Sequence, residues 1–322
     1  MSSKILITNP GIHFWLTEEL TNLGYECHFD YDSDKTGIEQ KITDYVGVVM
    51  KSRFRPDAAF FDKATHLRFL ARVGVGFEHI DVQYAKKRGI KILLSPEGSR
   101  DAVGEHTLGL LLCLLNNLAK GDREIRSGQW IREPNRGVEI KGKKVGIIGF
   151  GNMGKAFAKR LSGFGCRVMA YDKYKKGYGR KYAKETGLKT IFRESDIVSL
   201  HIPYDEHNHY FVDKKFLKKF KKPIYLLNTA RGLILKTKDL VSAMKKGRVL
   251  GAGLDVLEYE AQSFEEFRAS ELPKPFQYLI NSDRVVLSPH IAGWTQESKL
   301  KHAQTIVRKI QEVLSPQNAA KG

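Results

Sequence analysis

Three glycines at a fixed spacing constrain this chain more than any other feature. Gly149, Gly151 and Gly154 follow an apolar run at 145–148, and apolar residues then recur at helical spacing from 156 to 161. The pattern predicts a strand, a tight turn and a helix, a repeating unit of parallel sheets. Because such a turn presents backbone N–H groups and the positive end of the helix dipole, it predicts a dinucleotide site. Asn152 and Met153 belong to this predicted site.

The rest of the chain alternates strand and helix signals in two series. In the first series, apolar runs at Lys4–Thr8, Gly47–Lys51, Phe69–Gly74 and Ile90–Ser95 alternate with amphipathic stretches at Phe14–Leu23 and Val82–Arg88. The second series predicts six strands, at Lys144–Gly149, Arg167–Asp172, Asp196–His201, Ile224–Thr229, Val249–Asp255 and Val285–Ser288. Such alternation predicts an α/β fold of doubly wound parallel sheets, with ligand-facing residues at the carboxyl ends of the strands.

Two long helices are predicted outside this alternation. An apolar helix at about Ala102–Leu118 is expected to bridge two domains or to form a subunit contact, and the stretch Gly121–Lys141, with Trp130, is expected to be loop. A last helix begins near Thr295, and its apolar face predicts packing against the first domain. The longest apolar segment is too short to cross a membrane, and no signal peptide is expected, because the first predicted strand begins at Lys4.

Charge and cysteine content narrow the function classes. The formal net charge is +18, but residues 1–100 hold 14 Lys and Arg against 13 Asp and Glu, so the excess of 40 over 23 lies in 101–322. No recognition helix or aromatic platform accompanies it, so we interpret the charge as favouring solubility and anionic ligands rather than nucleic acid. Cys27, Cys113 and Cys166 lie far apart and are expected to be reduced thiols in the cytoplasm.

An acidic residue at the end of the strand after the glycine turn bears on the cofactor. Asp172 stands 23 residues after Gly149. A carboxylate at this place accepts a hydrogen bond from a ribose 2′-hydroxyl and repels a 2′-phosphate, so it favours NAD over NADP. Lysines at 173, 175 and 176 weaken that preference.

Three further segments supply an arginine, a carboxylate and a histidine at strand ends. Arg231 lies in Asn228-Thr229-Ala230-Arg231-Gly232, Glu260 follows Gly253-Leu254-Asp255, and His290 lies in Ser288-Pro289-His290. A histidine suits proton transfer to and from a hydroxyl, a carboxylate partner favours its imidazolium form, and an arginine can bind substrate oxygens bidentately. Each residue alone has a structural interpretation, but the set after a dinucleotide turn indicates hydride-transfer chemistry.

These segments resemble the D-isomer-specific 2-hydroxyacid dehydrogenase family. The match runs from Lys51-Ser52-Arg53 through Gly74-Val75-Gly76 and Ala102-Val103-Gly104-Glu105 to Ser288-Pro289-His290-Ile291-Ala292-Gly293. The resemblance implies a flavodoxin-like substrate domain at 1–98 with 289–322, a Rossmann NAD-binding domain at 99–288, an active site in the cleft between them, and a homodimer.

The resemblance also implies a role for each site residue. Arg231 would bind substrate, His290 would be the acid/base, and Glu260 rather than Glu258 would pair with it. Asp255 would hold the nicotinamide carboxamide, with Thr229 nearby, and His201 and Pro203 would line the adenine side. The backbone N–H groups of Val75 and Gly76 would hold the substrate carboxylate. The chain departs from the family at His79, where Asn is frequent, at Ala261, where Pro is usual, and in a long stretch at Gln262–Asn281, interpreted as a lid or a surface insertion.

Within the family the chain looks most like D-3-phosphoglycerate dehydrogenases of serine synthesis, in a short form for which no regulatory domain is expected. Lys51, Ser52 and Arg53 would then hold the substrate phosphate, although a solvated basic loop is the alternative. The other candidates are a glyoxylate or hydroxypyruvate reductase, another D-2-hydroxyacid dehydrogenase, and an NAD-sensing corepressor. No metal is expected.

Overall fold

The computed structural model describes residues 3–179, 181–260 and 273–315 and contains two compact units. The first unit comprises 1–99 and 294–322, and the second comprises 100–293. The chain passes between the units at 99/100 and at 293/294, against 98/99 and 288/289 in the prediction from sequence.

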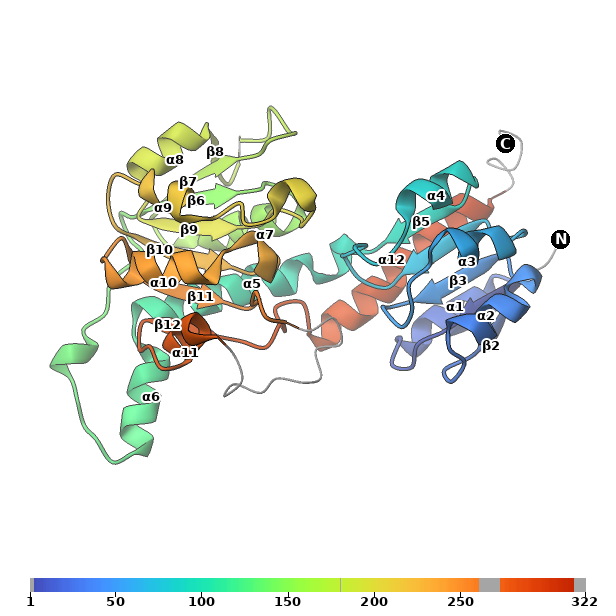
Figure 1. Ribbon diagram of the computed structural model, residues 1–322, viewed down its shortest axis with the longest axis horizontal. Helices are drawn as coiled ribbons and strands as arrows, with labels where there is room; N and C mark the ends of the chain where they lie inside the picture. Colours follow the sequence, from blue (N-terminus) through green and yellow to red (C-terminus); the bar gives the residue numbers. More distant parts are fainter. Residues whose placement is uncertain (1–2, 180, 261–272, 316–322) are drawn as a thin grey trace. The chain divides into compact units, whose positions relative to one another are not determined.

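The first unit is built on a five-stranded parallel sheet with the order β2-β1-β3-β4-β5 (Figure 1). Its strands are β1 (Lys4–Ile7), β2 (Glu26–Phe29), β3 (Gly47–Met50), β4 (Phe69–Arg72) and β5 (Lys91–Leu94). Its helices are α1 (Phe14–Asn22), α2 (Lys35–Lys41), α3 (Ala58–Lys63), α4 (Val82–Lys87) and α12 (Gln296–Leu314). The sequence did not predict β2, because this edge strand is half-exposed and its Cys27 and His28 interrupt any apolar run.

Both faces of this sheet are covered by a hydrophobic core, and successive residues of a strand pack into opposite cores. The strands therefore appear in the sequence as continuous apolar runs. Leu6 and Val48 pack with α2, α3 and α4, whereas Ile5 and Val49 pack with α1 and α12. The face of α12 in this second core consists of Ala303, Ile306, Val307 and Ile310. The C-terminal helix therefore completes the first unit, as the spacing of its apolar residues predicted.

The second unit contains a seven-stranded parallel sheet with the order β12-β11-β10-β9-β6-β7-β8. Its strands are β6 (Lys144–Ile148), β7 (Arg167–Tyr171), β8 (Lys184–Glu185), β9 (Ile197–Leu200), β10 (Ile224–Asn228), β11 (Val249–Leu254) and β12 (Val285–Leu287). All six predicted strands are present. The strand missed is β8, a two-residue edge strand made of a lysine and a glutamate. The strand order reverses at β6, between β7 and β9, which is the topological switch point of such sheets.

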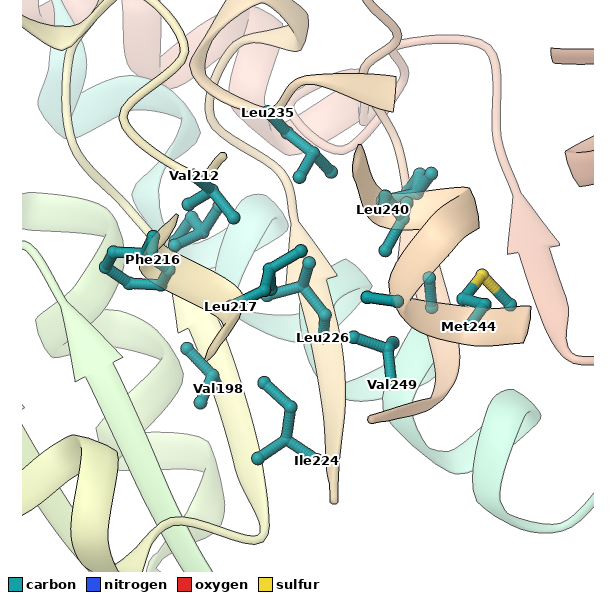
Figure 2. Packing of buried hydrophobic residues seen from close by; sticks show 14 of the residues in the cluster. Val198, Val212, Phe216, Leu217, Ile224, Leu226, Leu235, Leu240, Met244 and Val249 are labelled. Carbon is teal, nitrogen blue, oxygen red and sulfur yellow. The ribbon is translucent and has the colours of Figure 1, made fainter. Parts of the chain in front are cut away.

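Helices cover both faces of this sheet and bury two apolar clusters. They are α7 (Asn152–Arg160), α8 (Leu188–Glu194), α9 (Lys214–Lys218), α10 (Thr237–Lys245) and α11 (Lys274–Ile280), with most of α5 (Pro96–Leu115). Figure 2 shows Leu217 of α9, Leu226 of β10 and Met244 of α10 pointing into one cluster. Each such side chain contributes roughly 1.5–3 kcal/mol of transfer free energy on burial.

The long apolar helix differs from its prediction at both ends. It begins at Pro96 rather than near Ala102, and it ends at Leu115, two residues before Asn117 adopts a left-handed conformation with φ 52°. A separate helix, α6 (Leu118–Arg126), then occupies the start of the stretch predicted as loop. The stretch 262–272 lies outside the described residues, and α11 occupies most of 273–281, with Phe276 and Leu279 in the core.

No single helix in the described residues is long and apolar enough to cross a membrane. Helices α5 and α6, which are bent by 62° relative to each other, reach the length and apolar composition of a membrane span only when they are taken together. Buried core helices also meet that criterion, and Leu110, Leu111, Leu114 and Leu115 of α5 are buried in the second unit.

A partly buried histidine in the first unit predicts a pH-dependent stability. Burial lowers the pKa of His302 to about 4 from its ordinary 6.5, and its Nδ1 lies 2.7 Å from Ser95 Oγ. Between these pH values the unfolded chain binds a proton that the folded chain excludes, so this group's contribution to the free energy of unfolding falls as the pH falls. We expect His302→Asn to remove on the order of 3 kcal/mol of this pH dependence.

The measurement is chemical denaturation of the wild type and His302→Asn at several pH values from 7 to 4. His66→Asn serves as the control, because His66 is exposed in the same unit. Equal pH dependence in the wild type and His302→Asn would show that His302 is not held neutral by the fold.

Candidate active site

The predicted site residues of the second unit follow strands whose carboxyl ends share one edge of its sheet. The glycine turn follows β6, Asp172 follows β7, and His201 follows β9. The segments with Arg231, Asp255 and His290 follow β10, β11 and β12. Parallel strands end at the same edge, so residues more than a hundred positions apart are brought to one side of one sheet.

The glycine turn has the close packing that only glycine permits. Gly149 has φ 92°, and a Cβ there would lie 2.4 Å from the carbonyl oxygen of His201. A Cβ on Gly154 would lie 2.1 Å from the carbonyl oxygen of Gly149. Gly151 is the N-cap residue of α7, and a Cβ there would meet no heavy atom within 4 Å. The turn is therefore closely packed at Gly149 and Gly154 but open at Gly151, where the helix begins. This open space fits a pyrophosphate lying against the backbone.

Asp172 is held by the backbone of the loops around it. Its Oδ2 accepts from Phe150 N at 2.8 Å, and its Oδ1 accepts from Tyr174 N and Lys175 N at 2.9 Å each. Burial alone would raise the pKa of Asp172, but these N–H groups lower it below its ordinary value. The carboxylate is thus ionised and fixed beside the glycine turn, where it suits a ribose 2′-hydroxyl.

His201 lies behind the glycine turn, next to Phe157 of α7. Its Nε2 is 2.8 Å from Ser199 Oγ, and burial lowers its pKa to about 3, so the ring is neutral at physiological pH. Its Nδ1 is buried and has no hydrogen-bond partner within the described part of the chain. A buried polar atom without a partner beside the turn is consistent with a bound ligand there. Pro203 is exposed two residues later.

The segment after β10 is shaped by an asparagine to which the sequence analysis gave no role. Asn228 is fully buried; its Oδ1 accepts from Ala230 N at 3.1 Å and its Nδ2 donates to the carbonyl of Arg231 at 3.0 Å. Gly232 lies so close to the next loop that a Cβ would be 1.8 Å from Leu257 O. These contacts fix the backbone on both sides of Arg231. Thr229 Oγ1 is 3.1 Å from Thr107 Oγ1 on α5.

The structure brings His290 and Glu260 together. His290 Nδ1 lies 2.8 Å from Glu260 Oε2, and the other Glu260 oxygen accepts from Leu257 N. Because Nδ1 faces the carboxylate, it carries a proton, and the Nε2 edge of the ring points away from Glu260. Glu258 makes different contacts: it accepts from Tyr210 Oη at 2.6 Å and from Thr237 N at 2.7 Å.

Asp255 follows β11, and its buried carboxylate holds the turn that carries His290. Its carboxylate is 1% exposed and accepts from Ser288 Oγ at 2.6 Å, Ile291 N at 2.9 Å and Ala292 N at 3.0 Å. Burial would raise its pKa, but the hydrogen bonds of His106, Ser288 and the two backbone groups lower it. The carboxylate is thus held by donors of the protein itself, and its contact with a nicotinamide carboxamide stays a prediction.

His106 and Ser288 are site residues that the sequence analysis did not single out. Both lay beside or inside the quoted family motifs, which was the signal that could have drawn attention to them. No spacing rule connects a histidine on α5 with a serine at the end of β12, because their contact depends on the packing of the helix against the sheet.

The predicted substrate residues of the first unit lie at the ends of β3 and β4. Arg53 Nη1 donates to the carbonyls of Thr8 at 2.9 Å and Asp30 at 2.7 Å, and Nη2 donates to that of Ser33 at 2.6 Å. The guanidinium of Arg53 is therefore bound by three backbone carbonyl groups of the first unit.

Lys51 is in a different setting. Burial, followed by the charges of Lys299 and Arg72, lowers its pKa. Ser52 is exposed, and Val75 and Gly76 follow Gly74, whose φ is 152°. Within the described ranges, no three His, Cys, Asp or Glu side chains gather as metal ligands, and the three cysteines are unpaired and half-buried.

Comparison with known proteins identifies relatives over nearly the whole chain. The chain is 35% identical over 321 residues to a glyoxylate reductase of Thermofilum pendens, covering 96% of this chain and 89% of that protein. It is 34% identical to a hydroxypyruvate reductase of Thermotoga maritima, covering 82% and 83%. A D-3-phosphoglycerate dehydrogenase of Archaeoglobus fulgidus is 30% identical, covering 95% of this chain and 56% of that protein.

The fold and the NAD-binding domain have matches of their own. A D-isomer-specific 2-hydroxyacid dehydrogenase of Lactobacillus delbrueckii ssp. bulgaricus, solved in its NAD-complexed form, superposes with a TM-score of 0.83 at 26% identity, covering 98% of this chain and 97% of that one. Residues 108–292 match the family described as D-isomer specific 2-hydroxyacid dehydrogenase, NAD binding domain. The chain therefore belongs to the D-isomer-specific 2-hydroxyacid dehydrogenases and is an NAD-dependent oxidoreductase of that family.

Proposed function

We propose that this dehydrogenase reduces a small 2-oxo acid of the glyoxylate and hydroxypyruvate class with NADH. The observation that carries the proposal is the 2.8 Å pair between His290 Nδ1 and Glu260 Oε2 at the carboxyl edge of the NAD-binding sheet, which also carries Arg231. The names of the relatives at 35% and 34% identity support this substrate class. The reverse reaction oxidises the corresponding D-2-hydroxy acid.

In this mechanism His290 transfers the proton. Its Nδ1–H is held by Glu260, so its Nε2 exchanges a proton with the substrate oxygen. The carboxylate also holds the ring in place, with Nε2 directed away from Glu260. In reduction the proton moves from Nε2 to the carbonyl oxygen, and in oxidation it returns from the hydroxyl.

Arg231 binds the substrate anion. A guanidinium presents paired N–H donors that match a carboxylate, and it stays charged at every physiological pH. The hydrogen bonds of Asn228 fix the backbone on both sides of it, so the side chain starts from a defined position. Bound NAD, held by the glycine turn and Asp172, supplies or accepts the hydride.

Oxidation of D-3-phosphoglycerate, the substrate that the sequence favoured, is the second candidate. Lys51 supports it, because a half-buried ammonium beside Lys299 and Arg72 is stabilised by a bound anion. Arg53 gives it less support, because three backbone carbonyls already engage its guanidinium. The 30% identity to a phosphoglycerate dehydrogenase is compatible with either substrate.

The first prediction concerns the proton-transfer pair. We expect His290→Ala to lower kcat by about 10²- to 10⁴-fold, the usual contribution of a general acid or base, while the Kd for NADH stays unchanged. Glu260→Gln should lower kcat less, by about tenfold, because the amide retains the shape but not the charge. The measurements are steady-state kinetics and NADH fluorescence titration.

Glu258→Gln is the matched control, because Glu258 lies two positions away and contacts Tyr210 and Thr237 instead of His290. It should keep the kcat of the wild type. Equal losses in Glu258→Gln and Glu260→Gln would contradict the assigned pairing, and full turnover by His290→Ala would remove it as the acid/base.

The second prediction decides between the two substrate classes. We expect kcat/KM for glyoxylate or hydroxypyruvate to exceed that for 3-phosphohydroxypyruvate by about tenfold or more, since no complete phosphate clamp is built at Lys51 and Arg53. In the oxidising direction, D-glycerate and D-3-phosphoglycerate are compared with NAD⁺ at alkaline pH.

Lys51→Gln distinguishes the outcomes further. Phosphate-dependent turnover that falls at least tenfold in Lys51→Gln would establish the second candidate and place the enzyme in serine synthesis. Similar kinetics with and without the phosphate would leave Lys51 outside a phosphate site. Lys63→Gln is the control, because Lys63 pairs with Glu39 elsewhere in the first unit.

We also propose a cytoplasmic homodimer. The sequence predicts a contact surface at the Ala102–Leu118 helix and the Trp130 loop. We keep the Trp130 segment and add α6, because both extend away from the sheet of the second unit (Figure 1). The apolar side chains there are Leu118 at 57%, Ile125 at 53% and Trp130 at 81% exposure. Apolar groups gathered in this way mark interaction surfaces. The three free cysteines suit a reducing compartment.

The third prediction is that Ile125→Asp combined with Trp130→Asp converts a dimer to monomers. The charges would have to be desolvated in the interface, which opposes association. Sedimentation velocity of the wild type and the double variant measures this. A wild type that sediments as a monomer, or an unchanged dimer in the double variant, would contradict the proposed surface; Phe14→Asp, at an exposed site of the first unit, is the control.

A further inference from the structure

The turn that carries His290 is held in an uncommon backbone conformation. His290 has φ 54°, in the left-handed region that residues other than glycine seldom adopt. Its N–H donates to the carbonyls of Asp255 at 2.8 Å and Ser288 at 3.0 Å. The orientation of the imidazole therefore depends on contacts that keep this turn from relaxing.

The carboxylate of Asp255 supplies most of those contacts. It accepts from the two backbone N–H groups that follow His290, at Ile291 and Ala292, and from the hydroxyl that precedes it, at Ser288. The donors thus lie on both sides of His290 in sequence. Its Oδ1 accepts two of these bonds, from Ser288 and Ile291, and its Oδ2 accepts the third, from Ala292.

His106 of α5 lies beside both Ser288 and Asp255. Its Nε2 lies 2.8 Å from Ser288 Oγ and 3.3 Å from Asp255 Oδ1. The single hydroxyl proton of Ser288 is donated to Asp255, so Ser288 accepts from His106. Nε2 of His106 therefore carries a proton and donates it to Ser288 Oγ, and it lies 3.3 Å from Asp255 Oδ1.

We propose that His106 is a positioning residue for the proton-transfer step. It fixes Ser288 and Asp255, and these two residues hold the turn that aims His290. This inference rests on the proposed function in one respect, that His290 is the acid/base. His106 comes from the helix covering the sheet, so the packing of α5 is coupled to the orientation of the reactive imidazole.

Removal of a purely structural histidine would have different effects from removal of a positioning residue. Its removal would lower stability and leave kcat unchanged, whereas loss of a positioning residue lowers kcat at a constant Kd for NADH. Misplacement of a catalytic group by a fraction of an ångström to 1 Å reduces rates by about 10- to 100-fold. Separate measurement of kcat and KM, together with rescue of kcat by His106→Gln, therefore distinguishes the two roles.

The experiment compares His106→Ala, His106→Gln, Ser288→Ala and the double variant His106→Ala/Ser288→Ala. We expect His106→Ala to lower kcat by about 10- to 100-fold. His106→Gln should restore at least half of kcat, because its amide can donate from nearly the same place as Nε2. Since His106 acts through Ser288, the double variant should lose little more than the worse single variant. His66→Ala is the control, at an exposed histidine of the first unit.

Three results would overturn the inference: wild-type kcat in His106→Ala, no rescue by His106→Gln, or multiplicative losses in the double variant. If the thermal transition shows that His106→Ala does not fold, the kcat values of His106→Gln and Ser288→Ala are compared instead. Ser288→Ala must then lower kcat while His106→Gln does not.

A second readout does not depend on turnover. The Nδ1 proton of His290, held by Glu260 at 2.8 Å, is assigned in the proton NMR spectrum by its absence in His290→Ala. We expect this signal to shift or to exchange faster with water in His106→Ala and to be retained in His106→Gln. If the wild type reduces no 2-oxo acid, the proposed function fails, and an unchanged signal would separately refute the positioning role.

Discussion

The buried carboxylate of Asp255 is the interaction on which the arrangement of this site depends. An ionised carboxyl group that is 1% exposed is stable only when its lone pairs are satisfied, because desolvation of an unpaired charge costs several kcal/mol. Here the donors come from the end of β12, from the turn after it and from α5. Compensation of this charge therefore holds these three segments together. The turn after β12 is one of them, and it carries His290.

The three residues proposed to act on the substrate share one structural support. Arg231, Glu260 and His290 all follow strands of the second unit, at β10, β11 and β12, which are adjacent in the sheet. Backbone hydrogen bonds between neighbouring parallel strands fix the distance from one loop to the next. The mutual geometry of the three side chains is thus set within a single sheet. The same sheet carries the glycine turn at its switch point, so cofactor and proton-transfer groups have a common frame.

The sequence predicted most of this architecture because parallel strands buried on both faces appear as continuous apolar runs. β1, β3 and β6 were recognisable for that reason, whereas β2 and β8 are edge strands with polar or half-exposed residues. The break between α5 and α6 was missed because it depends on the left-handed conformation of Asn117, and neighbouring residues give no sign of it. The choice of Glu260 over Glu258 came from family resemblance, since spacing cannot tell which of two nearby carboxylates faces a histidine.

The basic residues of the first unit show why composition alone could not predict a substrate. Lys51 and Arg53 are two positions apart and formally equal in charge, yet the fold treats them differently. Arg53 offers planar, directional donors, and three backbone carbonyls from the neighbouring loops engage them. Lys51 is half-buried, and burial followed by the charges of Lys299 and Arg72 lowers its pKa. The two cations therefore differ in the fold, although the sequence presents both as one motif: carbonyl groups bind the arginine, and the lysine lies near other cations.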